Sequence, residues 1–445
     1  MTQAPVAPKA APRRHDREIF ALAVPAFGAL VAEPLFVMAD SAIVGHLGTP
    51  QLAGLGIAAA LLTTAVSVFV FLAYATTAAV SRRVGAGDLQ AAIRQGMDGI
   101  WLALLLGAVV IAVVLPTAPW LIYLFGASDT AAPYAITYLR ISALGIPAML
   151  MVLAATGVIR GLQDTRTPLY VAVGGFALNA GLNVLLVYGA GLGIAGSAWG
   201  TVIAQCAMAA AYLVVVVRGA RRHSASLRPD IAGIRACAQA GVPLLVRTLS
   251  LRAILMIATA VAARLGDADI AAHQILLALW SLLAFALDAI AIAGQAIIGR
   301  YLGASDTEGA KAVCRRMVQW GIAAGIVLGV LVVLARPVFI PLFTSDPAVE
   351  DALLPALLVV ALSQPVSGIV FVLDGVLMGA GDGRYLAWAM LVTLAVFTPA
   401  ALLVPALGGG LTTLWWAMTL MMLVRMVTLQ LRARSGRWLV AGATR

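Results

Sequence analysis

Two acidic residues inside an apolar stretch are the first candidates for chemistry in this chain. Glu33 and Asp40 lie seven residues apart in the segment EPLFVMADSAIVGHLG. Seven residues are two turns of an α-helix, so both carboxylates would lie on one helix face. An acid at the centre of a membrane helix costs about 2.5–3.5 kcal/mol, and such residues usually face a cavity or a partner. Because burial raises the pKa of a carboxyl group, we expect Asp40 to take up and release a proton, with a packing hydrogen bond to Asn179 or Asn183 as the alternative.

Glu33 is followed directly by Pro34, and this pair predicts a bend in the helix. Proline removes one backbone hydrogen bond and disfavours the α conformation of the residue before it. A bend beside an acid would act as a proton-sensitive hinge, with Glu33 tuning or sharing the proton step. In the alternative interpretation Glu33 is neutralised by Arg252, which is expected at a similar depth in the seventh span. Both interpretations can hold together.

Further polar residues fall inside apolar spans. Arg247 and Asp288 are expected at equal depth in adjacent antiparallel helices, which predicts a structural ion pair. Asp374 and Gln295 are candidates for the lining of an inner vestibule. An ionisable group in the membrane is a functional candidate by default, and pairing is the alternative.

The elements that must hold these residues are membrane-spanning helices. The chain has 445 residues, of which 62% are hydrophobic and 11% charged, whereas a soluble domain is near half apolar and a quarter charged. The apolar blocks of about 20–28 residues can cross a hydrocarbon core of about 30 Å, and they lack the alternation of a transmembrane β-barrel. The sequence therefore predicts an all-α polytopic membrane protein. Its twelve spans are expected at 18–44, 51–80, 95–121, 133–158, 168–188, 194–217, 236–262, 270–298, 314–335, 351–378, 385–404 and 411–431.

The net charge of +10 follows from topology and needs no nucleic acid as a partner. Of the 29 Lys and Arg residues, 24 fall on one side of the predicted spans. By the positive-inside rule that side is cytoplasmic, so both termini are expected in the cytoplasm and the protein in the inner cell membrane. Residues 1–17 lack a clear cleavage site before a long apolar run, and we interpret them as a cytosolic tail before a retained first helix.

The two halves of the chain repeat each other. A shift of 218 residues aligns them without a gap, and prolines, loop aspartates and arginines match in one register. The clearest pairs are Pro25/Pro243, Arg82/Arg300, Gly85/Gly303, Pro147/Pro365, Gly157/Gly375, Gly161/Gly379 and Asp164/Asp382. Because each repeat has an even number of spans, the repeats are parallel. Two such lobes around a central cleft are typical of transporters that work by alternating access.

The repeat also predicts the domain organisation. An N-lobe and a C-lobe of six helices each are joined by a basic linker and flanked by cytosolic tails. The predicted boundaries are 1–17 for the N-terminal tail, 18–217 for the N-lobe, 218–235 for the linker, 236–431 for the C-lobe and 432–445 for the C-terminal tail.

Several motifs carry a family resemblance. They are EPLFVMADSAIVGHLG, VSRRVGAGD, GVIRGLQDTRTP and GIAGSAWGTVIAQ, together with Asn179. On these motifs the chain, over about residues 17–435, resembles the multidrug and toxic compound extrusion (MATE) family, in particular its DinF-like branch. The resemblance implies efflux of amphipathic, often cationic compounds, coupled to protons or sodium ions. In that branch the aspartate of the first helix is regarded as the coupling residue, and Asp40 matches it.

One position departs from the pattern of that branch. The branch often has Asn-x3-Asp in the fifth helix, whereas FALNAGLNV has Asn179 and Asn183. A sodium site at Asp40, Asn179 and Asn183 would therefore have one carboxylate where the family pattern has two. Since Na⁺ favours several oxygen ligands that include charge, the departure favours protons, with Na⁺ as the alternative. No other metal and no cofactor are expected.

A substrate pocket is expected from adaptable and aromatic side chains. Methionine fills irregular space and suits promiscuous binding, and aromatic faces attract cations. The candidates are Phe36, Met38, Tyr74, Trp199, Met256 and Trp280. For each of them, packing against lipid or core is the alternative.

The sequence thus predicts a secondary active exporter that exchanges protons for organic cations or amphipathic compounds, as a monomer in the lipid bilayer. The chain has two lysines, Lys9 and Lys311, and neither completes a P-loop, so ATP does not drive it. No enzyme motif is present. One alternative is a lipid-linked oligosaccharide flippase of the same superfamily, and the other is a membrane receptor or scaffold that transports nothing.

Overall fold

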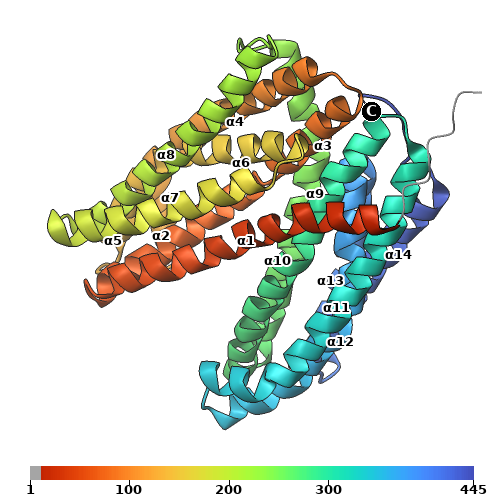
Figure 1. Ribbon diagram of the computed structural model, residues 1–445. Coiled ribbons are helices and arrows are strands. Elements are labelled where there is room, and N and C mark those ends of the chain that lie inside the picture. Colours follow the sequence, from red (N-terminus) through yellow and green to blue (C-terminus); the bar gives the residue numbers. More distant parts are fainter. Residues whose placement is uncertain (1–11, 445) are drawn as a thin grey trace, which may run out of the picture.

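The protein is helical throughout its described length, as the computed structural model in Figure 1 shows. The structure describes residues 12–444, except for the side chains of residues 12–14, 33 and 35–40. Among the described residues, ten helical segments are long and apolar enough to cross a membrane, and the bent pair α5–α6 makes an eleventh. Helix α1, of 34 residues, takes the place of the first predicted span. The prediction of a polytopic α-helical membrane protein is confirmed.

The helices follow the predicted spans in chain order. The first half of the chain forms α1 (Pro12–Gly45), α2 (Thr49–Val68), α3 (Phe71–Gly85), α4 (Leu89–Leu124), α5 (Ala132–Ala143), α6 (Ile146–Gly161), α7 (Arg166–Val184), the π-helical turn η1 (Leu185–Gly189) and α8 (Gly193–Arg222). The second half forms α9 (Ile231–Leu265), α10 (Asp267–Gly303), α11 (Thr307–Phe343), α12 (Pro347–Gly379), α13 (Gly383–Ala406) and α14 (Leu411–Ser435). Two spans of the first half are interrupted, α2–α3 and α5–α6, and the second of these bends by 50°.

The helices form two lobes that meet at one end and diverge towards the other (Figure 1). Helices α1–α8 make the N-lobe and α9–α14 make the C-lobe. Between the lobes, α3 packs against α9, α10 and α12, and α4 packs against α9. Helix α1 bridges them, because it packs along α7 of its own lobe and against α10 and α11 of the other.

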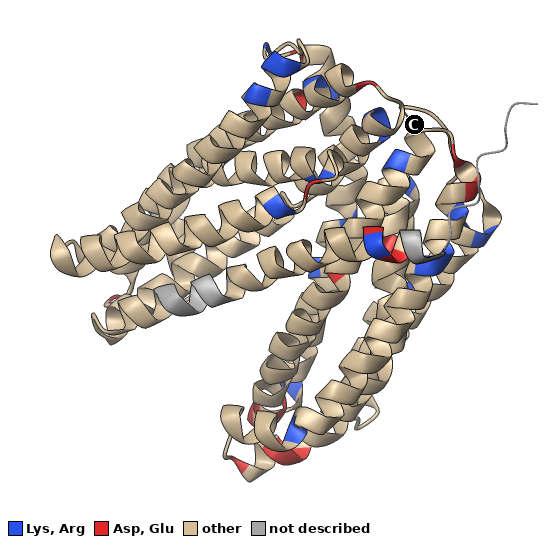
Figure 2. Ribbon diagram, viewed as in Figure 1, with Lys and Arg blue, Asp and Glu red and all other residues tan. Residues whose placement is uncertain are grey.

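The end at which the lobes meet is rich in Lys and Arg, as Figure 2 shows. We call it the basic end. It carries the turns at residues 86–88, 163–165, 223–230, 304–306 and 380–382. The opposite end, here the far end, carries the acidic tip of the C-lobe (Figure 2).

The linker between the lobes is fixed to α4 at the basic end. The indole N–H of Trp101 donates to the carbonyl of Leu227 at 3.1 Å, and Arg94 pairs with Asp230 at 2.7 Å. Asp230 also accepts a hydrogen bond from the backbone N–H of Ala232 at the start of α9. That bond, together with Arg94, holds the pKa of Asp230 below its usual range. A charged cap therefore begins the first helix of the C-lobe.

The backbone turns repeat with the same 218-residue offset as the sequence. Gly48 and Gly266 both have positive φ, at 137° and 141°. Gln163 and Gly381 form a second such pair, with φ of 68° and 70°. Positive φ strains most residues other than glycine, so an accidental match of these turns is improbable. The duplication seen in the sequence is also a duplication of backbone geometry.

Helix packing repeats in the same way. A Cβ atom on Gly107 would lie 2.5 Å from the Cα of Pro147, and one on Gly325 would lie 2.7 Å from the Cα of Pro365. These four residues are two equivalent pairs, and each pair brings two helices of one lobe into backbone contact. Small residues at such crossings are how membrane helices approach closely.

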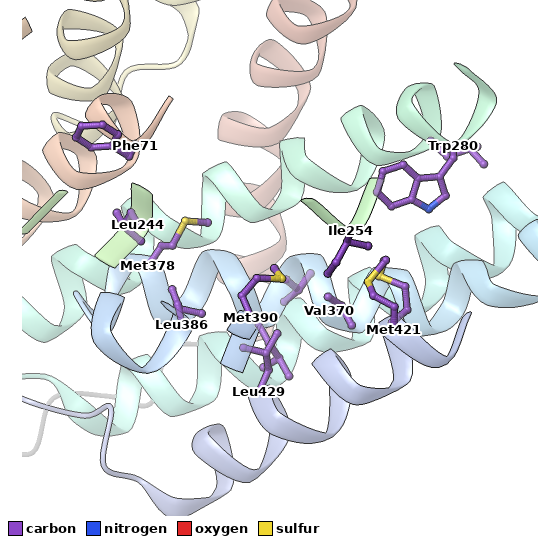
Figure 3. Close-up of a cluster of buried hydrophobic side chains, with 14 of the residues drawn as sticks. Phe71, Leu244, Ile254, Trp280, Val370, Met378, Leu386, Met390, Met421 and Leu429 are labelled. Carbon is purple, nitrogen blue, oxygen red and sulfur yellow. The ribbon is translucent and has the colours of Figure 1, made fainter. Parts of the chain in front are cut away.

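The apolar core continues from one lobe into the other near the basic end. Phe71 and Leu72 of α3 belong to the same buried cluster as Leu244 of α9 and the interior of the C-lobe, and Figure 3 shows part of this cluster. A separate cluster, which includes Leu55 and Leu139, fills the far half of the N-lobe. The shared core holds the lobes together where α3 meets α9 and α10.

Candidate functional site

A buried chain of amides and hydroxyls lies inside the N-lobe. The amide of Asn183 donates to the side-chain oxygen of Asn179 at 2.9 Å, and Asn179 donates to the hydroxyl of Thr201 on α8 at 3.1 Å. Asn179 is 2% exposed and Asn183 is fully buried. A Cβ on Gly200 would overlap the side-chain oxygen of Asn183, so glycine at that position leaves room for the amide. The two asparagines predicted from the sequence are therefore brought together.

A π-helical turn, Leu185–Gly189, follows Asn183 directly. Such turns occur mostly as single bulges and often at functional sites. Sequence patterns did not predict it, because a π-turn has no distinctive periodicity.

Helix α1 runs alongside α7 in the same direction. A Cβ on Gly28, in the middle of α1, would lie 3.0 Å from Leu169 near the beginning of α7. Near the end of α1, the carbonyl of Ile43 accepts a 2.5 Å hydrogen bond from Tyr188 of η1, which continues α7. Asp40 precedes Ile43 by three residues and Asn183 precedes Tyr188 by five. The backbones of these helices therefore place Asp40 and Asn183 at a similar depth.

Four predicted site residues have side chains outside the described part of the structure. They are Glu33, Phe36, Met38 and Asp40. Pro34 lies within α1, which is one continuous helix from Pro12 to Gly45.

The C-lobe contains a buried cluster of one acid and two arginines. Asp374 of α12 pairs with Arg425 of α14 at 2.8 Å and with Arg247 of α9, and all three residues are at least 91% buried. One carboxylate thus faces two guanidinium groups inside the lobe. Pairing of this kind offsets part of the large cost of burying the charges.

The predicted Arg247–Asp288 ion pair is wrong. Arg247 binds Asp374, while Asp288 accepts a 3.4 Å hydrogen bond from the hydroxyl of Tyr74 in the other lobe. Helix α9 packs more extensively against α13 than against α10. The rotation of α9 therefore turns Arg247 towards α12. Arg425 is not among the predicted site residues, although its position inside the last predicted apolar span, 411–431, indicates burial.

Tyr74 and Gln295 form a polar contact between the lobes. The side-chain amide of Gln295 on α10 donates to the backbone carbonyl of Tyr74 on α3 at 2.6 Å. With the Tyr74–Asp288 bond, this gives α3 two polar bonds to α10 beside the apolar interface. Gln295 is 1% exposed, so it lies in the joint between the lobes and not in an open vestibule.

The described aromatic and methionine candidates for the substrate pocket are dispersed. Met256 on α9 is 72% exposed and Trp199 on α8 is 41% exposed. Trp280 is 9% exposed and packs in the core of the C-lobe (Figure 3). Trp280 is therefore a packing residue in this conformation.

The face of α9 that meets the N-lobe can be followed from the joint between the lobes towards the far end. Gly241 lies against Phe71 of α3, with a Cβ position 2.5 Å from the ring. Arg252 follows eleven residues later, about three helical turns, so it lies on the same face, and its side chain is exposed. Arg252 and the exposed Met256 thus lie on the side of α9 that faces the N-lobe.

The described residues contain no group of three or more His, Cys, Asp or Glu side chains that could hold a metal ion. A sodium site at Asp40, Asn179 and Asn183 would need the carboxylate whose side chain is outside the described part.

Comparison with known proteins places the chain in one family. The sequence model of the MatE family matches it twice, at residues 25–185 and 243–403, and both ends of the second match lie 218 residues after those of the first. The chain is 32% identical over 439 residues to Protein DETOXIFICATION 44, chloroplastic, of Arabidopsis thaliana, covering 95% of this chain and 83% of the relative. It is 30% identical over 440 residues to DNA damage-inducible protein F of Escherichia coli (strain K12), covering 96% and 94%.

The fold is also similar to that of a solved transporter. The crystal structure of the Vibrio cholerae MATE transporter VcmN in the bent form superposes with a TM-score of 0.87 at 22% identity, covering 96% of this chain and 99% of that one. The relative from E. coli agrees with the DinF-like resemblance of the motifs. With both repeats matched and almost the whole chain aligned, the chain belongs to the MatE family of membrane transporters.

Proposed function

We propose that the chain exports organic cations and other amphipathic compounds in exchange for protons, with Asp40 as the coupling carboxylate and Glu33 as an accessory acid. Its family supports the coarser statement that it is a multidrug efflux transporter and not an enzyme. The observation that carries the finer proposal is the buried pair of Asn179 and Asn183, held beside the part of α1 that contains Asp40.

The two lobes differ in this region, which supports a dedicated site in the N-lobe. The residues 218 positions after Asn179 and Asn183 are Phe397 and Ala401, and both are fully buried. The residue 218 positions after Asp40 is Ala258, which is also buried. Burying a polar group costs free energy. Polar groups that occur in only one of the two copies are therefore more consistent with a function of that lobe than with a requirement of the fold.

The arrangement of the lobes supports alternating access. By the positive-inside rule, the basic end would face the cytoplasm and the protein would lie in the inner cell membrane. In that orientation the described state is closed towards the cytoplasm, and its lobes diverge towards the outside. Asp40 would take up a proton from the outside in this state. Asp40 would release the proton to the cytoplasm after the lobes separate at the basic end. We propose that one monomer completes this cycle without a partner subunit.

The energetics limit the stoichiometry. One pH unit is worth about 1.4 kcal/mol per proton, and 100 mV is worth about 2.3 kcal/mol per net charge moved. Exchange of one proton for one monovalent cation moves no net charge, so it uses the pH term alone and gives roughly tenfold accumulation per pH unit. A steeper gradient needs a second proton, for which Glu33 is the candidate.

The test is export of a fluorescent lipophilic cation from reconstituted vesicles under an imposed pH gradient. Asp40→Asn should abolish the flux. Asp129→Asn, an exposed acid in a loop of the far end, is the matched control and should transport normally. The same vesicles are then tested with a sodium gradient alone.

The outcomes separate the alternatives. If sodium alone drives the flux, the coupling ion is Na⁺ in spite of Asn183. If neither gradient drives any of several cations, the efflux proposal fails, and a flippase of the same superfamily or a scaffold is favoured. If Asp40→Asn transports as well as the unaltered protein, the assignment of Asp40 is wrong.

A further inference from the structure

A buried arginine of the N-lobe binds the chain segment that follows the last helix of the C-lobe. Arg82 of α3 is 2% exposed. One of its terminal nitrogens donates to the carbonyls of Gly442 at 2.9 Å and Thr444 at 3.2 Å. The other donates to the carbonyls of Val440 at 2.6 Å and of Ala380, at the end of α12, at 3.2 Å. All four acceptors belong to the C-lobe or to the segment after it.

That segment, Gly436–Thr444, is itself anchored to the C-lobe. Gly436 ends α14 with a positive φ of 68°, and Trp438 is 1% exposed and donates to the carbonyl of Ala433 at 2.9 Å. The N–H of Gly442 donates to the carbonyl of Leu302 at 2.9 Å, near the end of α10. The segment therefore lies over the joint between the lobes with its carbonyls turned towards α3.

The chemistry of arginine suits this contact. A guanidinium group has five N–H donors in a planar fork, and hydrogen bonds with a charged donor are stronger than neutral ones. One side chain can thus tie several carbonyls of another body to its own helix. The same bonds must all break if α3 moves away from the C-lobe.

The repeat does not account for this arrangement. Arg300 is equivalent to Arg82 in the other repeat, but its side chain is 36% exposed and pairs with Glu18 of α1. The burial of Arg82 comes from the segment after α14. In the part of the chain that the structure describes, the equivalent position after α8 is taken by the linker held on α4, and Arg300 pairs with α1 instead.

We propose that Arg82 and the segment Gly436–Thr444 form a latch that closes the basic end and opens once in each transport cycle. The inference rests on the proposed alternating access, in which the basic end must open to the cytoplasm. The latch would favour the closed state described here and set how often the inward-open state is reached. In this role Arg82 is a positioning residue, since it acts on the separation of the lobes and not on the substrate.

The test measures the separation of the lobes without any transported substrate. Spin labels are placed on Arg166→Cys and Arg384→Cys, two exposed and equivalent positions at the basic end of the N-lobe and the C-lobe. The three native cysteines are replaced by alanine. The distance distribution in lipid is recorded for the otherwise unaltered chain, for Arg82→Gln and for a chain lacking residues 440–445, which keeps Trp438.

Both latch variants should add a longer distance at the expense of the shorter one. Loss of even one charge-assisted hydrogen bond changes an equilibrium by about tenfold, so the shift should be at least of that order. Arg82→Gln combined with the deletion should give the same distribution as Arg82→Gln alone, because the substitution already removes every Arg82 bond that the deletion removes. The deletion alone leaves the bond to Ala380, so its shift should not exceed that of Arg82→Gln. Arg82→Lys keeps the positive charge but has fewer N–H donors, so it should restore part of the population at the short distance.

The matched control is Arg83→Gln, which removes the same charge one residue later. Arg83 donates to Gln95 within the N-lobe, so its loss should leave the distances unchanged. The proposal is overturned if folded Arg82→Gln and the deletion both keep the unaltered distribution, or if their effects add. The distance measurement involves no flux, so its result does not depend on whether drug export is seen in the vesicle assay. Failure of the latch proposal and failure of the proposed function can therefore be told apart.

Discussion

Gly85 and Gly303 occupy equivalent positions in the two repeats, and each lies against the backbone of the other lobe. A Cβ on Gly85 would overlap the carbonyl oxygen of Arg300, and a Cβ on Gly303 would overlap the carbonyl oxygen of Arg82. The two helices α3 and α10 therefore cross at their ends with no room for a side chain. The contact is reciprocal, as a pseudo-twofold axis requires. It explains why the sequence keeps glycine at both positions.

The first prediction concerns this crossing. Gly303→Val should separate the basic ends, because the obstacle is backbone and cannot rotate away. Overpacking of this kind typically costs about 1–3 kcal/mol, which is enough to shift the balance between open and closed states by about tenfold or more. The distance between labels on Arg166→Cys and Arg384→Cys should lengthen. Gly174→Val is the control, since a Cβ on Gly174 meets nothing within 4 Å, and an equal effect of both variants would contradict the prediction.

Much of the fold could be predicted because the repeat marks the positions that pack. Prolines and glycines matched across 218 residues turn out to lie at close helix crossings, as Gly107 and Pro147 show. The hydrophobic runs predicted the spans, because a membrane helix must cross a hydrocarbon layer of fixed thickness and form all its backbone hydrogen bonds within itself.

The partners of the buried charges could not be predicted in the same way. Depth along a helix follows from residue number, but the direction of a side chain follows from helix rotation, and this decided that Arg247 meets Asp374 and not Asp288. Arg82 and Arg300 match across the repeat, but the match does not give their partners. Arg82 binds the irregular segment after α14, which has no periodicity to reveal it in the sequence, whereas Arg300 pairs with Glu18 of α1.

The second prediction concerns the stability of the C-lobe. Asp374→Asn leaves Arg247 and Arg425 buried and facing each other without a counter-charge. Removal of one partner from a buried ion pair typically costs about 3–5 kcal/mol, so the thermal unfolding temperature in detergent should fall clearly. Glu350→Gln, at the far end, should leave it unchanged.

Replacing the whole cluster tests the reason for that loss. Buried ionic triads can often be exchanged for apolar residues of similar volume without loss of stability. The triple variant Arg247→Met, Asp374→Leu, Arg425→Met should therefore be more stable than Asp374→Asn. If the triple variant is less stable than the single one, the two unpaired arginines are not the cause.

The third prediction concerns the amide pair of the N-lobe. Gly200→Ala places a methyl group where the side-chain oxygen of Asn183 lies, so it should displace Asn183 from Asn179. We expect the protein to fold and the proton-driven flux to fall by about tenfold, the equivalent of about one hydrogen bond at the site. Gly181→Ala, on the same helix as Asn183 with nothing within 4 Å of its Cβ, should transport normally. Equal flux in both variants would show that the amide pair does not contribute to transport.

The last prediction concerns the coupling ion. Asn183→Asp is nearly isosteric and adds a second carboxylate at the depth of Asp40, which supplies the additional charge that a sodium ion favours. The unaltered protein should respond to a pH gradient and not to sodium, whereas Asn183→Asp should gain flux under a sodium gradient alone. The double variant Asp40→Asn, Asn183→Asp again has a single carboxylate and should lose that gain. Sodium-driven flux in the unaltered protein, or no response to sodium in Asn183→Asp, would mean that residue 183 does not select the ion.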